Sequence, residues 1–214
     1  MKTITLNPGL SIRELNKAIE LNPSNAEAYV FLAYTLIELG RFREAEMNLT
    51  KAGQLAPSTP LMQFAWLRYY IFTRNPEKLA GLMKEMGGAD QPDTGGYRKT
   101  LYYFLKDRYD SMAVYAGGRF VNPALRGIAY AKTGRSAQAQ KIIDSLKATS
   151  ENDNAFAIGI IYAWLGEKGK AIDYLRLANK LYDYNLIGIK VDKLFDPLRN
   201  EEGFKELLRR MGLG

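Results

Sequence analysis

The chain has 214 residues, 47% of them hydrophobic, and its 30 basic and 23 acidic side chains give a formal charge of +7. This composition allows a substantial core, and no run of about 18 apolar residues is present to span a bilayer. The sequence contains neither cysteine nor histidine, which excludes disulfides, thiol catalysis and every nucleophile that a histidine activates.

The first predicted element is a single helix, which forms half a repeat at residues 9–22. Leu15 and Ala18 stand where Leu49 and Ala52 stand in the next repeat, so this helix corresponds to the second helix of a hairpin. A second helix without its first leaves an apolar stripe uncovered, and the ends of repeat arrays normally carry polar caps. We therefore expect the chain to be the C-terminal part of a longer protein.

Residues 26–59 predict two antiparallel helices that are separated at Gly40. Ala33 and Ala45 are small where the two helix axes would cross, so the backbones can approach closely. The apolar residues of both helices recur at the helical period. They are Tyr29, Leu32, Ala33 and Leu36 in the first helix and Phe42, Ala45, Leu49 and Ala52 in the second.

Two less regular hairpins are expected at residues 60–92 and 93–119. In the first of them Asn75 and Pro76 replace the glycine turn, because asparagine can cap a helix and proline suits its first turn. The glycine-rich stretch at 87–96 lacks the ending of a phosphate-binding loop and follows no strand. We interpret it as a connector, and no metal site or cofactor is predicted.

Residues 120–151 and 152–183 are two adjacent copies of one hairpin. Four residues of the first copy recur in the second after 32 residues. The pairs are Gly127 and Gly159, Tyr130 and Tyr162, Gly134 and Gly166, and Ala139 and Ala171. Internal repetition at this period is typical of helical repeat proteins.

The remaining residues, 184–214, predict a capping segment. The stretch 185–192 alternates apolar residues and is expected to be an extended linker, because strand signals are otherwise almost absent. Helix starts are expected at Asp196–Pro197 and at 200–202, where an N-cap oxygen and acidic residues suit the positive end of a helix dipole.

The repeats at 26–57 and 152–183 resemble the tetratricopeptide repeat family, and a looser likeness extends over residues 11–183. The tail that contains Phe195, Asp196 and Pro197 is similar to the closing segment of tetratricopeptide modules in bacterial multidomain regulators. The resemblance implies an all-α, right-handed superhelical solenoid of antiparallel hairpins. We expect one such domain over residues 1–214.

The same resemblance implies a non-catalytic scaffold that binds a peptide or a partner domain on its concave face. The groove would be lined by one stripe on the first helix of each hairpin. Carried over by position, the stripe is Val30, Tyr34, Ile37, Phe64, Arg68, Ile71, Ile128, Phe156, Ile160 and Trp164, with Ala124 and Ala131 beside them. Phe156 and Trp164 would be apolar anchors, and Arg68 would orient an acidic group; packing between helices or under the tail is the alternative for these residues.

Two other functions remain open. The chain could be a sensory or regulatory C-terminal domain of a longer bacterial regulator of the DNA-binding or cyclase type. It could instead bind nucleic acid through its central segment, since residues 58–119 hold 9 basic and 6 acidic residues and residues 120–151 hold 5 and 2. An ordinary solvated helical surface explains the same charges and is favoured.

No secretory signal is visible at the N-terminus. We expect a cytoplasmic location, or a periplasmic one if the chain belongs to a larger protein. No catalytic residue is predicted, and the partner is expected to be a protein or peptide, with no insertion into a membrane.

Overall fold

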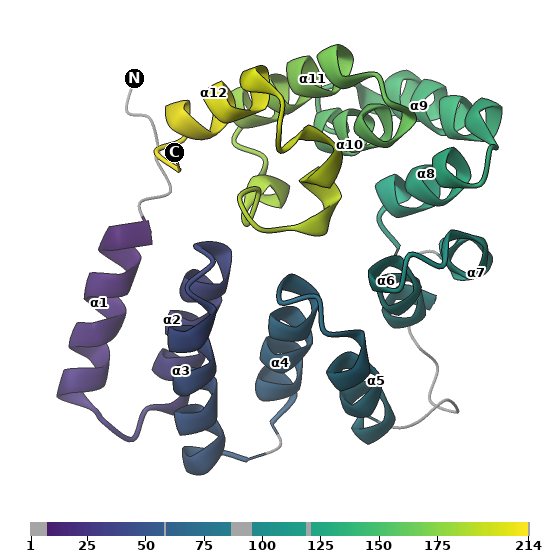
Figure 1. Ribbon diagram of the computed structural model, residues 1–214. Helices are drawn as coiled ribbons and strands as arrows, with labels where there is room; N and C mark the ends of the chain where they lie inside the picture. The colour runs from purple at the N-terminus through teal and green to yellow at the C-terminus, as the bar shows by residue number, and fades with distance from the viewer. Residues whose placement is uncertain (1–7, 58, 87–95, 119–120, 214) are drawn as a thin grey trace. The chain divides into compact units, whose positions relative to one another are not determined.

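The computed structural model describes residues 8–57, 59–86, 96–118 and 121–213 (Figure 1). These residues form helices and turns with no strand among them, so the predicted all-α repeat fold is confirmed. The chain divides into two compact units, residues 1–86 and 87–214, here called unit 1 and unit 2. A single continuous solenoid domain stays a prediction.

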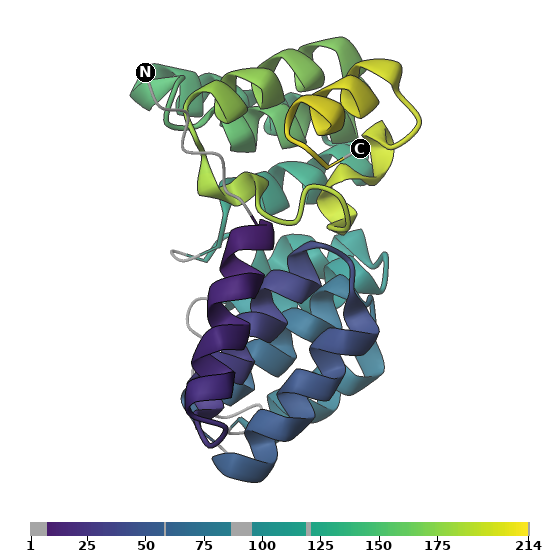
Figure 2. The same cartoon turned by 90° about the vertical axis from the view of Figure 1, so that its left-hand side faces the viewer.

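Unit 1 contains the half repeat and the two hairpins that follow it. Its helices are α1 (Pro8–Leu21), α2 (Ala26–Glu38), α3 (Phe42–Leu55), α4 (Pro60–Phe72) and α5 (Pro76–Glu85). Helices α2 and α3 pack on each other as the first hairpin, and α4 packs on both of them (Figure 2).

Unit 2 contains three hairpins and the tail. Its helices are α6 (Tyr97–Leu105), α7 (Tyr109–Tyr115), α8 (Pro123–Lys132), α9 (Ser136–Ser150), α10 (Ala155–Leu165) and α11 (Lys168–Lys180). The tail adds η2 (Tyr184–Leu186), η3 (Lys193–Leu198) and α12 (Glu202–Arg210). Residues 87–95, which hold most of the glycine-rich stretch, lie outside the described residues.

The predicted packing stripe forms the core of unit 1. Ala33, Ala45 and Leu49 are fully buried, while Tyr29 and Phe42 lie at the edge of the same cluster. Side chains this small at the crossing point allow two helices to approach closely. The register that the sequence gives for α2 and α3 is therefore confirmed.

Each hairpin among the described residues turns through one residue with positive φ. These residues are Gly40, Arg74, Asp107, Gly134 and Gly166, with φ values between 53° and 86°. The next N–H donates to a carbonyl near the end of the first helix, as Arg41 does to Leu36 at 2.8 Å and Arg108 to Tyr103 at 3.0 Å. This is the hydrogen bond of a Schellman C-cap. The irregular hairpins thus keep the turn geometry although they have lost the glycine.

The repeated Gly127 and Gly159 both permit close approach, but to different neighbours. A Cβ atom on Gly127 would lie 2.4 Å from Cγ1 of Ile161, so α8 and α10 touch there. A Cβ atom on Gly159 would lie 3.2 Å from the carbonyl oxygen of Ala171, where α10 meets α11. Gly127 therefore allows two successive hairpins to pack closely, whereas Gly159, at the same position of the next copy, allows the two helices of one hairpin to pack closely.

The prediction of an extended linker at 185–192 is wrong, because this stretch forms η2 and a run of turns. The Asp183 carboxylate accepts a hydrogen bond from the N–H of Asn185 at 2.9 Å, and Gly188 has a φ of 80°. Turn-forming aspartate and glycine outweigh the short apolar alternation here. Leu186 and Ile189 are buried as a result.

The expected helix start at Asp196–Pro197 is also displaced. Helix η3 begins at Lys193, since the Asp192 carboxylate accepts from the N–H of Leu194 at 2.9 Å, and Pro197 lies inside it. Helix α12 does begin in the predicted stretch 200–202, with Glu202 in its first turn, but its N-cap residue Glu201 makes no side-chain cap hydrogen bond.

Candidate functional site

Five of the predicted groove residues expose almost none of their surface to solvent. Val30, Ile37, Ile128, Phe156 and Ile160 are all buried in their units. The first helix of a hairpin packs against its partner and against neighbouring hairpins, as α2 does against α1, α3 and α4, so its open side is narrow. These five belong to the core, which corrects their assignment to a surface.

Helix α10 shows the reason most clearly. Its sequence, AFAIGIIYAWL, is apolar all round, which is typical of a helix enclosed on every side. Helices α8, α9, α11 and η3 pack against it. The Phe156 ring meets the Phe195 ring of the tail edge-on, with 6.1 Å between ring centres.

Trp164, the predicted anchor, is held by the tail instead of facing an open groove. Its indole N–H donates to the carbonyl of Leu194 at 2.8 Å, and its ring lies edge-on to Phe104 with 5.6 Å between centres. Its apolar surface is thus largely used within unit 2.

Lys193 fastens the same tail to α6. Its ammonium group donates to the carbonyl of Phe104 at 2.8 Å and to the carboxylate of Asp107 at 2.8 Å, and the residue is only 9% exposed. Cations favour the C-terminal end of a helix, where carbonyls lack partners. Burial would raise the pKa of the Asp107 carboxyl, but hydrogen bonds from Lys193 and Tyr109 lower it below its ordinary value.

In unit 1 the equivalent surface is open. Phe31 of α2 is 48% exposed and Phe64 of α4 is 57% exposed, and Tyr34, Arg68 and Ile71 are partly exposed. Helices α2 and α4 contact each other. We call this surface the α2–α4 face and define it by Phe31, Tyr34, Glu38, Phe64, Arg68, Ile71 and Phe72.

Arg68 occupies the middle of the α2–α4 face and is already paired. One of its terminal nitrogens donates to the Glu38 carboxylate at 2.9 Å. Its guanidinium also lies 5.7 Å from the centre of the Tyr34 ring and 5.1 Å from that of Phe72. The expectation that Arg68 orients an acidic ligand is therefore at odds with its contacts, because its charge is met by Glu38.

The surroundings in the α2–α4 face raise the pKa values of Glu38 and Tyr34. Burial raises the pKa of the Glu38 carboxyl, and the charge and hydrogen bond of Arg68 oppose that rise without cancelling it. Burial likewise raises the pKa of the Tyr34 hydroxyl, against the charge of Arg68. The ion pair thus sits in a partly dehydrated, aromatic setting.

Three residues of the face were missed by sequence reasoning: Phe31, Glu38 and Phe72. Phe31 and Glu38 each lie one position after a predicted groove residue, Val30 and Ile37. A shift of one residue rotates a helix by about 100°, which exchanges a buried side for an exposed one. The polar Glu38 beside apolar Ile37 was the available signal for the open side.

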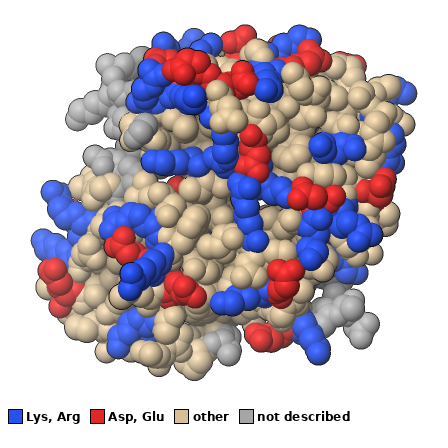
Figure 3. Space-filling model, viewed as in Figure 1, with Lys and Arg blue, Asp and Glu red and all other residues tan. Residues whose placement is uncertain are grey.

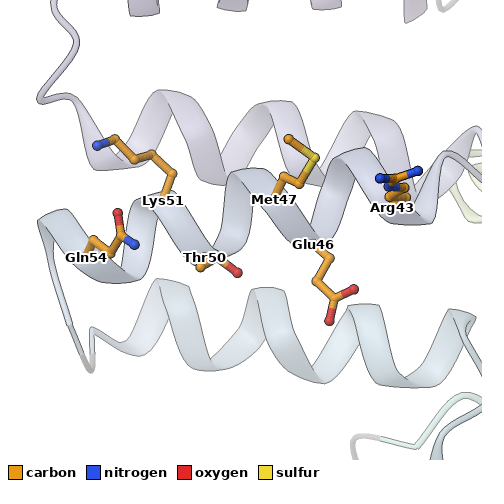
Figure 4. Close-up of a pocket in the computed structure, with 6 residues that line it drawn as sticks. All are labelled: Arg43, Glu46, Met47, Thr50, Lys51 and Gln54. Atoms are coloured by element: carbon orange, nitrogen blue, oxygen red, sulfur yellow. The ribbon is translucent and has the colours of Figure 1, made fainter.

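A shallow hollow lies on α3, and all the residues that line it belong to that helix. Figure 4 shows Lys51, Met47 and Arg43 in one row along the helix and Gln54, Thr50 and Glu46 in another. The Glu46 carboxylate accepts a hydrogen bond from the hydroxyl of Tyr69 at 3.1 Å. The rows mix both charges and gather no set of groups suited to a reaction.

Charge is mixed elsewhere as well. On the side shown in Figure 3, Lys and Arg side chains lie interspersed with Asp and Glu. The described residues contain no cluster of three or more potential metal ligands among Asp, Glu, His and Cys. Within the same residues no helix is both long and apolar enough to cross a membrane.

Comparison with known proteins finds a similarity in part of unit 1. Residues 14–47 match the family described as Tetratricopeptide repeat; the match starts in α1, includes all of α2 and ends in α3. The human Tetratricopeptide repeat protein 13 is 40% identical over 65 residues, which is 30% of this chain and only 8% of the human protein. No solved structure matches the chain significantly.

Proposed function

We propose, from the premise that this chain carries tetratricopeptide repeats, that it is an interaction scaffold which binds a peptide or a segment of another protein on the α2–α4 face. Such repeats generally mediate contacts between proteins. The observation that supports this face is the exposure of Phe31 and Phe64, at 48% and 57%.

Aromatic residues exposed on a firmly packed base are well suited to binding. Aromatic side chains supply most of the energy of many protein interfaces when a partner buries them. Beneath the face, Ala33 and Ala65 are fully buried, so the two helices that carry the rings have little freedom to shift. Because this surface is already ordered, little conformational entropy of the chain would be lost when a partner binds.

We propose no reaction for the chain. Tetratricopeptide proteins are typically non-catalytic, and the sequence offers no histidine or cysteine as base or nucleophile. The regulatory role in a longer bacterial protein and the binding of nucleic acid stay predictions. Nucleic acid would be recognised by binding that weakens steeply as salt rises.

Photocrosslinking tests the proposed face. A benzophenone amino acid at position 64 should crosslink to a partner in extracts of the native host, and the Phe31→Ala change should abolish that crosslink. The matched control is position 114, where Val114 of α7 is 75% exposed. Equal crosslinking at positions 64 and 114, or a crosslink that survives Phe31→Ala, would exclude the α2–α4 face as the binding surface.

A further inference from the structure

The charges of the α2–α4 face indicate which partner chemistry it accepts. Glu27 and Glu38 fall on the same side of α2 as Phe31, by the helical spacing of three and four residues. Arg68 of α4 is bound to Glu38 at 2.9 Å, while Glu27 lies at the N-terminal end of the same side. Together with Glu27 beside it, the α2–α4 face therefore presents two carboxylates and one guanidinium, an excess of negative charge.

An acidic ligand would have to compete with Glu38 for the guanidinium of Arg68. The Arg68 and Glu38 side chains are only 33% and 29% exposed, so drawing Arg68 away leaves a poorly hydrated carboxylate without its cation. Leaving one member of such a pair alone is costly. A cationic ligand meets no such obstacle, because it can approach Glu27 and the free side of Glu38 while the ion pair stays intact.

Unit 2 contains an internal example of what this kind of helix face binds. The tail places a lysine, Lys193, on the carbonyl of Phe104 at the end of α6. Two positions later it places a phenylalanine, Phe195, against Phe156 of α10. The segment that fills the face of unit 2 thus combines an aromatic side chain with a nearby cation.

Resting on the proposed function, we propose that the α2–α4 face binds an apolar segment that carries an aromatic residue and a nearby lysine or arginine, and that the Glu38–Arg68 pair excludes acidic segments. Phe31 and Phe64 receive the aromatic side chain. Glu38 is the residue that determines specificity.

Selection from a random 12-residue peptide library displayed on phage tests this chemistry. Wild-type protein should enrich peptides with aromatic and basic residues and deplete Asp and Glu. A Phe31→Ala, Phe64→Ala double variant, in which both rings are removed from an exposed surface, should enrich none of them. Circular dichroism should show unchanged helicity in the double variant.

A matched peptide pair then isolates the role of Glu38. For an enriched peptide, changing its lysine to glutamate should weaken binding to the wild type about tenfold or more, an effect in the range of close charge pairs at interfaces. The Glu38→Gln variant keeps the side-chain shape and frees Arg68, so the same ratio should fall below about threefold.

The outcomes separate the two proposals. Enrichment of acidic peptides that depends on Phe31 and Phe64 would overturn the inferred chemistry and leave the binding face standing. An unchanged lysine-to-glutamate ratio in Glu38→Gln would overturn the role of Glu38. If no peptide depends on Phe31 and Phe64, the proposed function itself fails and this inference with it.

Discussion

The two units carry the same kind of helix face in opposite states. In unit 1 the α2–α4 face leaves Phe31 and Phe64 about half exposed. In unit 2 the tail covers α10, so that Phe156 is buried against Phe195. The repeat pattern alone thus does not decide whether a face is available to a partner, because a segment outside the repeats can occupy it first.

The largest expected effect comes from removing the ring that closes unit 2. Phe195 is fully buried between Phe156 and Phe204, and a Phe→Ala change in such a core costs about 3–5 kcal/mol. Phe195→Ala should lower the free energy of unfolding in urea by that amount. The matched Phe64→Ala change should cost less than about 0.5 kcal/mol; similar losses for both variants would contradict the contrast between the faces.

The next effect concerns the cation that fastens the tail. Lys193→Met keeps the length of the side chain but removes the hydrogen bonds to Phe104 and Asp107. The Asp107 carboxylate then keeps the hydroxyl of Tyr109 as a donor, and the Phe104 carbonyl keeps the longer bond from the Asp107 N–H at 3.3 Å; we expect a loss of about 1–3 kcal/mol. Urea unfolding measures it, and limited proteolysis should cut the tail faster than in wild type. A variant as stable and as resistant as wild type would show that the tail is held by its apolar residues alone.

The two irregular turns allow a smaller and more discriminating comparison. Arg74 in unit 1 and Asp107 in unit 2 hold the same turn with φ values of 56° and 53°. The relief of backbone strain in Arg74→Gly should contribute about 0.5–1 kcal/mol of stability, because glycine adopts positive φ without strain. Thermal melting measures the change.

Asp107→Gly is the counterpart of that variant. It gains the same backbone relief but loses the carboxylate that binds Lys193, so its melting temperature should rise less than that of Arg74→Gly. A rise equal to that of Arg74→Gly would mean that the ion pair with Lys193 contributes nothing to stability.

The smallest expected effect is a dependence on pH. The pKa of Asp107 in the folded chain lies below its ordinary value of 3.8, so its contribution is present above that pH and is lost as the pH falls through the lowered pKa. Since the carboxylate is 63% exposed, the contribution is about 0.5 kcal/mol or less. The stability difference between wild type and Asp107→Asn should shrink from pH 6 to pH 3; a constant difference would contradict it.

The sequence predicted the hairpins well because their register depends on local spacing. Ala33, Ala45 and Leu49 recur at the period of a helix, and all three are buried as expected. The binding stripe was harder to predict, since Val30 and Ile37 lie only about 100° from exposed Phe31 and Glu38. When a helix carries two adjacent apolar stripes, the residue spacing alone does not show which of them packs against a neighbouring helix.

The tail was predicted least well, because its structure depends on contacts far along the chain. Lys193 binds the carbonyl of Phe104, 89 residues earlier, and no local pattern announces such a partner. Helix α10 did carry a signal, since a helix that is apolar all round needs a cover on every side.

The dependence of α10 on the tail has a consequence for the order of synthesis. Trp164 leaves the ribosome before Phe195, and at about 5–20 residues per second the intervening chain takes about two to six seconds to make. During that interval the side of α10 that η3 covers has no cover, whereas α2 and α4 need only the helices up to α5, which follows α4 directly. Unit 2 can therefore complete its packing only after the tail has been made.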